Sequence, residues 1–123
     1  MKSHKDLKVY KESILFVTSI YLKTNEFPKS EIFGLTSQIR RSAVSIPSNI
    51  AEGLARNHTK ENIQFLHIAL GSASELDAQL EISWNLNYLD KPTFDILNEN
   101  LQSIMKMLHG LLRSVKSKLV QAH

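Results

Sequence analysis

Apolar side chains recur at alternating steps of three and four residues over most of the chain. This is the pattern of helices that bury one face. It predicts helices at about residues 6–25, 31–56, 60–88 and 92–119. Links of about three to six residues make neighbouring helices antiparallel. The sequence therefore predicts an all-α protein in which residues 1–123 form a single up-down-up-down antiparallel four-helix bundle.

Each predicted helix carries one apolar stripe that we expect to face the core. In chain order, the four stripes are Leu7, Tyr10, Ile14, Val17 and Tyr21; Ile32, Leu35, Ile39, Ala43, Ile46, Ile50 and Leu54; Leu66, Ala69, Ala73, Leu76, Leu80 and Trp84; and Phe94, Leu97, Leu101, Ile104, Leu108, Leu111 and Val115. Ser30 and Thr59 are the predicted N-caps of the second and third helices, and Asp90 opens the fourth before Lys91 and Pro92.

Pro47 lies inside the second predicted helix. A proline there removes one backbone hydrogen bond and clashes with the carbonyl group four residues earlier. We expect a kink at about Ala43–Ile46, because the apolar stripe keeps its phase across the proline. A complete break into two helices is the less favoured alternative.

Three of the predicted helices carry further apolar or small side chains outside their core stripes. These positions are Val9, Phe16 and Ile20; Val44, Ser48, Ala51 and Ala55; and Phe65, Ile68 and Ser72. One bundle buries one stripe per helix, so the surplus surface predicts self-association, with closed ring symmetry as the default. The alternative interpretation is a wide bundle face with scattered apolar surface residues.

A polar strip borders the core stripe of the second helix. Its members are Arg41, Ser45, Asn49, Glu52 and Arg56, and the third helix can add Glu75 and Gln79. Pairing of Arg41 with Glu75, or of Glu52 with a nearby arginine, would order a subunit interface. Phosphate binding by the arginines is the alternative. We favour the structural role, because a strip that contains glutamate and asparagine tracks phosphates poorly.

The net charge of +3 is distributed unevenly along the chain. Residues 1–11 carry +3 and residues 106–123 carry +4, which leaves −4 for residues 12–105. In an antiparallel bundle, both chain ends and the link between the second and third helices lie at one end. The opposite end carries mostly acidic side chains.

A basic end of this kind predicts phosphate binding through charge attraction and counterion release. The candidate nucleic-acid-binding residues are Lys5, Lys8, Lys11, Arg56, Lys60, Arg113 and Lys116. Two simpler explanations compete with this one. Lysines near a helix C-terminus offset the helix dipole, and basic chain ends favour solubility.

The motifs of enzymes and metal proteins are missing from the sequence. None of the five histidines follows a carboxylate by three residues, and no phosphate-binding glycine loop or nucleophile elbow occurs. The chain has no cysteine, no apolar run long enough to span a membrane and no signal-peptide pattern. These observations predict a cytoplasmic, non-enzymatic protein without a metal or cofactor. A helix-turn-helix DNA binder around residues 50–70 is disfavoured by the length of the helices.

Two strings carry a family resemblance. QIRRSAVSIPSNIAEGLAR (38–56) and FLHIALGSASELDAQLEIS (65–83) resemble the bacterial four-helix-bundle proteins encoded within intervening sequences of 23S ribosomal RNA genes. DLKVYKES (6–13) and the phrase FP-x-x-E-x-FGL (27–35) fit that family too. The family is related to the accessory variability determinant of diversity-generating retroelements. The resemblance implies a homopentameric ring, association with nucleic acid and, more remotely, a reverse transcriptase as partner.

The expected function is that of a non-enzymatic homo-oligomer, with five copies favoured, that binds nucleic acid through its basic end. RNA is preferred over DNA. The alternative is a protein-interaction scaffold or an accessory subunit, for example of a reverse transcriptase, that does not itself contact nucleic acid. The expected subunit contacts are made by Val9, Phe16, Arg41, Val44, Ser45, Ser48, Asn49, Ala51, Glu52, Ala55, Phe65, Ile68, Ser72 and Glu75.

Overall fold

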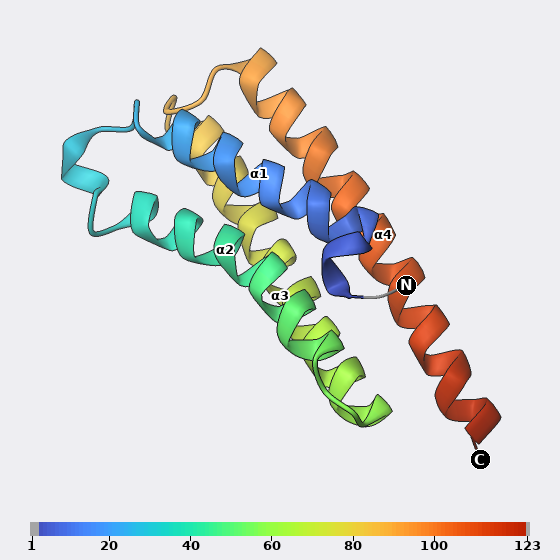
Figure 1. The fold of residues 1–123 in the computed structure, drawn as a ribbon. Coiled ribbons are helices and arrows are strands. Elements are labelled where there is room, and N and C mark those ends of the chain that lie inside the picture. Colours follow the sequence, from blue (N-terminus) through green and yellow to red (C-terminus); the bar gives the residue numbers. More distant parts are fainter. Residues whose placement is uncertain (1–2, 123) are drawn as a thin grey trace.

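The computed structural model describes residues 3–122, which form four α-helices and two short 3-10 helices (Figure 1). The α-helices are α1 (Lys8–Thr24), α2 (Leu35–Leu54), α3 (Thr59–Asn85) and α4 (Lys91–Ala122). The 3-10 helices are η1 (His4–Asp6) before α1 and η2 (Lys29–Glu31) before α2. No strand occurs among the described residues. The predicted all-α, four-helix fold is confirmed.

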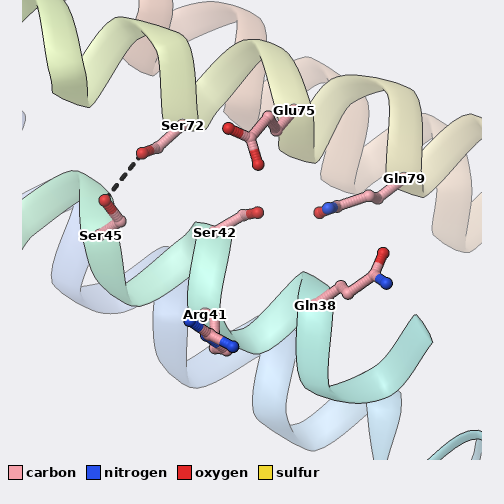
Figure 2. Close-up of a pocket in the computed structure, with 7 residues that line it drawn as sticks. All are labelled: Gln38, Arg41, Ser42, Ser45, Ser72, Glu75 and Gln79. Atoms are coloured by element: carbon pink, nitrogen blue, oxygen red, sulfur yellow. Dashed lines mark hydrogen bonds between the residues drawn. The ribbon is translucent and has the colours of Figure 1, made fainter. Parts of the chain in front are cut away.

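Side-chain contacts show how each helix packs on the next. Near the start of α2, the Arg40 guanidinium lies 4.6 Å from the ring centre of Tyr21 at the end of α1. The α2–α3 pair is joined at mid-length by a 2.7 Å hydrogen bond between the hydroxyls of Ser45 and Ser72 (Figure 2). At the α3–α4 connection, the ring of Trp84 on α3 stacks on the ring of Phe94 on α4, with 4.7 Å between the ring centres. The fourth side of the bundle is the packing of α1 on α4.

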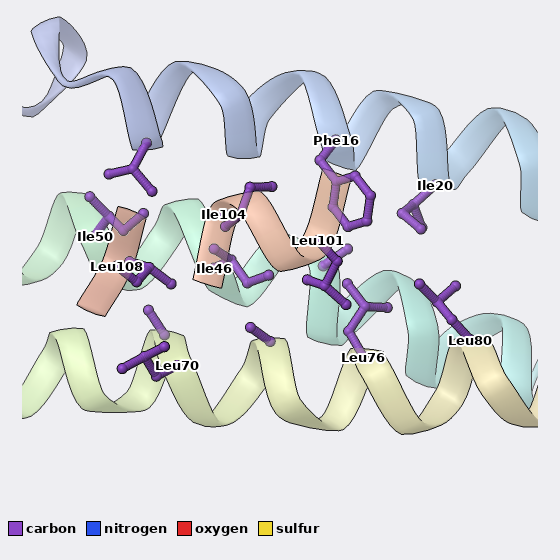
Figure 3. Close-up of a cluster of buried hydrophobic side chains, with 14 of the residues drawn as sticks. Phe16, Ile20, Ile46, Ile50, Leu70, Leu76, Leu80, Leu101, Ile104 and Leu108 are labelled. Carbon is purple, nitrogen blue, oxygen red and sulfur yellow. The ribbon is translucent and has the colours of Figure 1, made fainter. Parts of the chain in front are cut away.

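The core lies between the four helices, and side chains from all four meet there (Figure 3). The predicted stripes of α2, α3 and α4 supply most of it. Their buried members are Ile39, Ala43, Ile46 and Ile50; Leu66, Ala69, Ala73, Leu76 and Leu80; and Leu97, Leu101, Ile104, Leu108 and Val115. Periodicity therefore identified the inner face of these three helices correctly.

The predicted orientation of the first helix is wrong in part, since only Leu7, Tyr10 and Val17 of its stripe pack against the core. Val9, Phe16 and Ile20, which we expected to point outward to a neighbouring subunit, are only 5%, 3% and 0% exposed. Ile14 and Tyr21, which we expected in the core, are 42% and 40% exposed. Val9 and Phe16 therefore belong to the core of the single chain and are withdrawn as subunit contacts.

Two buried hydroxyl groups explain why the pattern of α1 misled. Ser13 and Thr24 lie on the buried face, where a purely apolar stripe would exclude them. The Ser13 hydroxyl donates to the Tyr10 carbonyl (2.8 Å), and the Thr24 hydroxyl donates to the Ile20 carbonyl (2.7 Å). A hydroxyl that bonds back to its own helix can be buried at little cost. With both faces apolar, the spacing alone could not choose between them.

The second helix begins later than predicted, at Leu35, and Ser30 does not cap it. Instead, the Leu35 backbone N–H donates to Glu31 Oε1 at 3.2 Å. Gly34 permits this arrangement, because a Cβ at residue 34 would lie 2.8 Å from Glu31 Oε1. The helix then continues through Pro47, whose side chain is buried. The kink near Ala43–Ile46 remains a prediction.

The ends of the other helices differ from each other in their capping. Thr59 is the first residue of α3 rather than its cap, and His58 before it makes no capping hydrogen bond through its side chain. At α4 the prediction holds, since Asp90 Oδ1 accepts the Thr93 backbone N–H at 2.9 Å. Hydrogen bonds from the Thr93 hydroxyl and this N–H lower the pKa of Asp90. The ionised carboxylate also suits the positive end of the helix dipole.

Candidate nucleic-acid interface and subunit contact face

The basic residues of the chain gather toward one end of the bundle. The start of α1, the α2–α3 connection and the last third of α4 all lie away from the α1–α2 and α3–α4 connections (Figure 1). All seven candidate nucleic-acid-binding side chains are exposed: Lys5, Lys8, Lys11, Arg56, Lys60, Arg113 and Lys116. The fold therefore leaves each of them accessible to a phosphate.

Arg56 differs from the other six because it is held by neighbours in its own chain. Its guanidinium lies 3.1 Å from Glu52 Oε1, and it sits 5.1 Å from the ring centre of Phe65. The ion pair partly neutralises its charge, although both side chains remain about half exposed. Among the described side chains, the other six candidates make no ion pair. Arg56 is therefore the weakest candidate of the set.

The outer face of α4 carries a basic row that the candidate set covered only in part. Lys106, His109, Arg113 and Lys116 follow one another at steps of three, four and three residues and are all exposed. Side chains at this spacing share one face of a helix. No acidic residue follows Glu99 in the sequence. The spacing of Lys106 and His109 was the signal that could have added both residues to the candidate set.

An apolar groove runs along the outside of the bundle between α1 and α2. Its walls are the side chains of Tyr10, Ile14, Val17, Thr18, Val44, Pro47, Ser48 and Ala51. Val44, at 39% exposure, and the small residues Ser48 and Ala51 belong to the face predicted to meet another subunit. The α1 side of the groove comes from the predicted core stripe, of which Tyr10 and Val17 also pack against the core, whereas Ile14 is exposed. The predicted surplus of exposed apolar surface therefore exists. On α1, however, it is formed by the face with Tyr10, Ile14 and Val17 and not by the face with Val9 and Phe16.

Further apolar side chains are exposed on α3 and in the turn before α2. Ile68 and Ile82 on α3 are 44% and 47% exposed, and Ala55 at the end of α2 is also exposed. Phe33 is 94% exposed, in the turn that Glu31 and Gly34 hold. A phenyl ring in that position contributes nothing to the core of its own chain. It is a surface feature that the sequence pattern did not single out.

Several residues of the predicted subunit interface are used within the chain instead. Ser72 is 9% exposed and shares its hydrogen bond with Ser45, so its predicted outward orientation is wrong. Asn49 Nδ2 donates to both the carbonyl and the hydroxyl of Ser45 at 2.8 Å. Small hydroxyl side chains thus let α2 and α3 approach closely. Phe65 is half-buried at the same junction.

Arg41 and Glu75 line a polar groove between α2 and α3, together with Gln38, Ser42, Ser45, Ser72 and Gln79 (Figure 2). Figure 2 shows the Glu75 carboxylate directed into the groove from α3, with Arg41 on the α2 side. No ion pair joins Arg41 to Glu75 in the chain as described. Their predicted pairing therefore does not occur within one subunit in this structure.

The described residues offer no arrangement typical of a metal centre. No three histidine, aspartate or glutamate side chains among them come close enough to share an ion. None of the helices in the described part of the chain has the length and apolarity that crossing a membrane requires.

Fold and surface together define a small α-helical bundle with a basic end and an incompletely covered outer face. The chain belongs to the family of 23S rRNA-intervening sequence proteins, because the model of that family matches residues 5–110. This confirms the resemblance carried by the strings at 38–56 and 65–83. The description of the family names no enzymatic activity.

A solved structure supports the assignment. The chain is similar to a protein of unknown function from the S23 ribosomal protein family of Bacteroides thetaiotaomicron, with 28% sequence identity and a TM-score of 0.78. The alignment covers 85% of this chain and 97% of that protein. No protein of curated function matches the chain.

Proposed function

We propose that this protein is a non-enzymatic homo-oligomer that binds nucleic acid, preferentially RNA, through its basic end. The observation that carries the proposal is the exposure of Lys5, Lys8, Lys11, Lys60, Arg113 and Lys116 without an ion-pair partner among the described side chains. Unpaired cations on one end of a molecule attract a polyanion without reading its bases.

Self-association would strengthen this weak binding. The groove between α1 and α2 leaves apolar side chains uncovered, and a second copy of the chain could cover them. Five copies are the number that the family resemblance implies. A ring that carries one basic end per copy would bind a long nucleic acid with the avidity of several linked sites.

Binding of a fluorescent RNA hairpin, measured by anisotropy at about 50 mM salt, tests the location of the site. The test variant replaces Lys8, Arg113 and Lys116 with glutamine. Three phosphate contacts at about 1 kcal/mol each predict a loss of affinity of roughly a hundredfold. Equal affinity of this variant and the wild type would contradict the proposal.

The matched control removes the same charge at the opposite end, through Lys23→Gln, Lys29→Gln and Lys91→Gln. All three lysines are exposed, so the fold should tolerate their loss. The proposal expects the control to bind within about threefold of the wild type. If both variants weaken binding equally, net charge rather than the basic end governs the interaction.

A second candidate function is a scaffold that docks another protein. The specific observation in its favour is Phe33, which is 94% exposed on a turn fixed by the Glu31–Leu35 hydrogen bond. Exposed aromatic anchors are common at the centres of protein interfaces. A partner that survives nuclease treatment but is lost with Phe33→Ala would favour the scaffold over the nucleic-acid binder.

A further inference from the structure

A pocket opens beside the α1–α2 connection, away from the basic end of the bundle (Figure 1). Its volume is about 380 Å³, which lies within the range of about 300–1,000 Å³ that is usual for small-molecule sites. Phe27, Pro28 and Ile32 supply its apolar walls. Phe27 is buried, and its ring packs against Tyr88 with 5.3 Å between the ring centres. This wall of the pocket is therefore fixed, whereas Ile32, at 47% exposure, borders solvent.

Arg40 also lines this pocket, and neighbours at the end of α1 hold its guanidinium in place. Its Nε donates to the Thr24 hydroxyl at 2.9 Å, and its Nη2 donates to Asn25 Oδ1 at 3.0 Å. The group also lies 4.6 Å from the ring centre of Tyr21. These partners are uncharged, and no described carboxylate lies within ion-pair distance of Arg40. Its Nη1 makes no hydrogen bond to a described residue, so two N–H donors stay available.

The charged side chains that line the pocket are all positive. Besides Arg40, Lys29 lines it, is exposed and makes no ion pair with a described side chain. Glu31 belongs to the same connection but does not line the pocket, and its carboxylate accepts hydrogen bonds from the Leu35 backbone N–H and the Tyr88 hydroxyl. The pocket therefore combines apolar walls with two cations that no described carboxylate pairs with. A complementary ligand has an apolar body and one small anionic group.

We propose that this pocket binds a small carboxylic acid with an apolar body. The carboxylate pairs with Arg40 and Lys29, and the apolar part lies against Phe27 and Ile32. A charged pair of guanidinium and carboxylate is stronger than a hydrogen bond between neutral groups. Because Arg40 is already held in place, binding costs little further ordering of its side chain. The site is separate from the basic end and does not depend on nucleic-acid binding.

Isothermal titration calorimetry with phenylpropanoate and octanoate tests the pocket, and the uncharged amides of both acids are the matched controls. At least one of the acids should bind saturably with a dissociation constant of about 1 mM or below, and its amide should bind at least about tenfold more weakly. Absence of binding of both acids up to about 10 mM, or equal affinity of an acid and its amide, overturns the proposal.

Substitutions at the rim locate the site, because Arg40 also joins α1 to α2 and its loss would disturb the fold. Ile32→Glu adds a negative charge beside the two cations and should weaken binding of the acid at least about tenfold. Phe33→Glu makes the same change of charge at a side chain that is 94% exposed and outside the pocket, so it should bind the acid as the wild type does. Lys29→Gln should weaken binding about threefold, whereas Lys23→Gln, at an exposed lysine outside the pocket, should not. Wild-type affinity of Ile32→Glu, or an equal loss in Phe33→Glu, overturns the proposal.

A free acid and the C-terminal residue of a peptide offer the same carboxylate, and a peptide distinguishes these two sources. The probe is a short peptide that ends in phenylalanine with a free carboxylate. Tighter binding of this peptide than of phenylpropanoate assigns the pocket to a chain terminus, and the reverse order assigns it to a free acid. In both cases the Arg40 Nε–H signal in nitrogen–proton correlation NMR spectra should shift on binding. An acid that binds without shifting this signal occupies another site and overturns the proposal.

Discussion

Alanine at residue 53 tests the close packing of α2 on α3. Gly53 is buried near the end of α2, and a Cβ there would lie 2.9 Å from the Cβ of Phe65 and 3.4 Å from the Asn62 carbonyl oxygen. The Cβ of Phe65 is the root of its side chain, so relief requires a shift of the α3 backbone. Overpacking of this kind costs about 1–3 kcal/mol.

Helix propensity acts in the opposite direction. Replacing glycine with alanine inside a helix gains up to about 1 kcal/mol, and less near a helix end. The overpacking cost is larger, so we expect Gly53→Ala to be destabilised by about 1–2 kcal/mol. For a chain of this length, that corresponds to a melting temperature lower by about 3–10 °C.

Gly71→Ala is the matched control. Gly71 lies on α3, is exposed, and a Cβ there would meet no atom within 4 Å. Only the propensity gain remains, so this variant should be more stable by about 0.5–1 kcal/mol. Thermal and urea unfolding followed by circular dichroism, at one fixed protein concentration, measure both. A Gly53→Ala variant as stable as Gly71→Ala would refute the close approach of the two helices.

Three further predictions follow from the core and the helix ends. Phe16→Ala should cost about 3–5 kcal/mol of unfolding free energy, whereas Ile14→Ala should cost less than half as much, as chemical denaturation can show. The lowered pKa of Asp90 adds stability that is present above its unfolded-state pKa and lost as pH falls through the folded value. Acid titration of Asp90→Asn should therefore show a shallower loss than the wild type. The hydrogen bond from the Tyr88 hydroxyl to Glu31 (2.9 Å) raises the pKa of Tyr88, so its contribution disappears at alkaline pH, and Tyr88→Phe should remove that alkaline dependence.

Spacing alone identified the buried faces of α2, α3 and α4, because the second apolar sets of α2 and α3 contain fewer or smaller side chains than their core stripes. Ile39, Ala43, Ile46 and Ile50 are all buried, as their three-and-four spacing indicated. The same reasoning failed for α1, which is apolar on both sides. Only the tertiary structure decides between two such faces, since the buried face of α1 also contains the polar residues Ser13 and Thr24.

The candidate sites were predictable to different degrees. The basic end follows from the positions of charged residues in an antiparallel bundle, which requires only the helix order. For the apolar groove between α1 and α2, the sequence correctly predicted that Val44 and Ser48 on α2 face outward. It placed the α1 residues of the groove, such as Ile14, in the core instead. The polar groove between α2 and α3 could not be predicted from the sequence. The spacing of residues along each helix does not show where two packed helices separate.

The central claim is that the basic end holds nucleic acid by its charge, and the salt dependence of RNA affinity tests this most directly. Counterion release predicts a linear fall of log K with log salt concentration, with a slope of about −0.7 to −0.9 per phosphate contact. The glutamine variant at Lys8, Arg113 and Lys116 should flatten that slope by about two to three for each copy that contacts the RNA. Absence of binding at about 50 mM salt, or an affinity that salt does not change, would contradict the account.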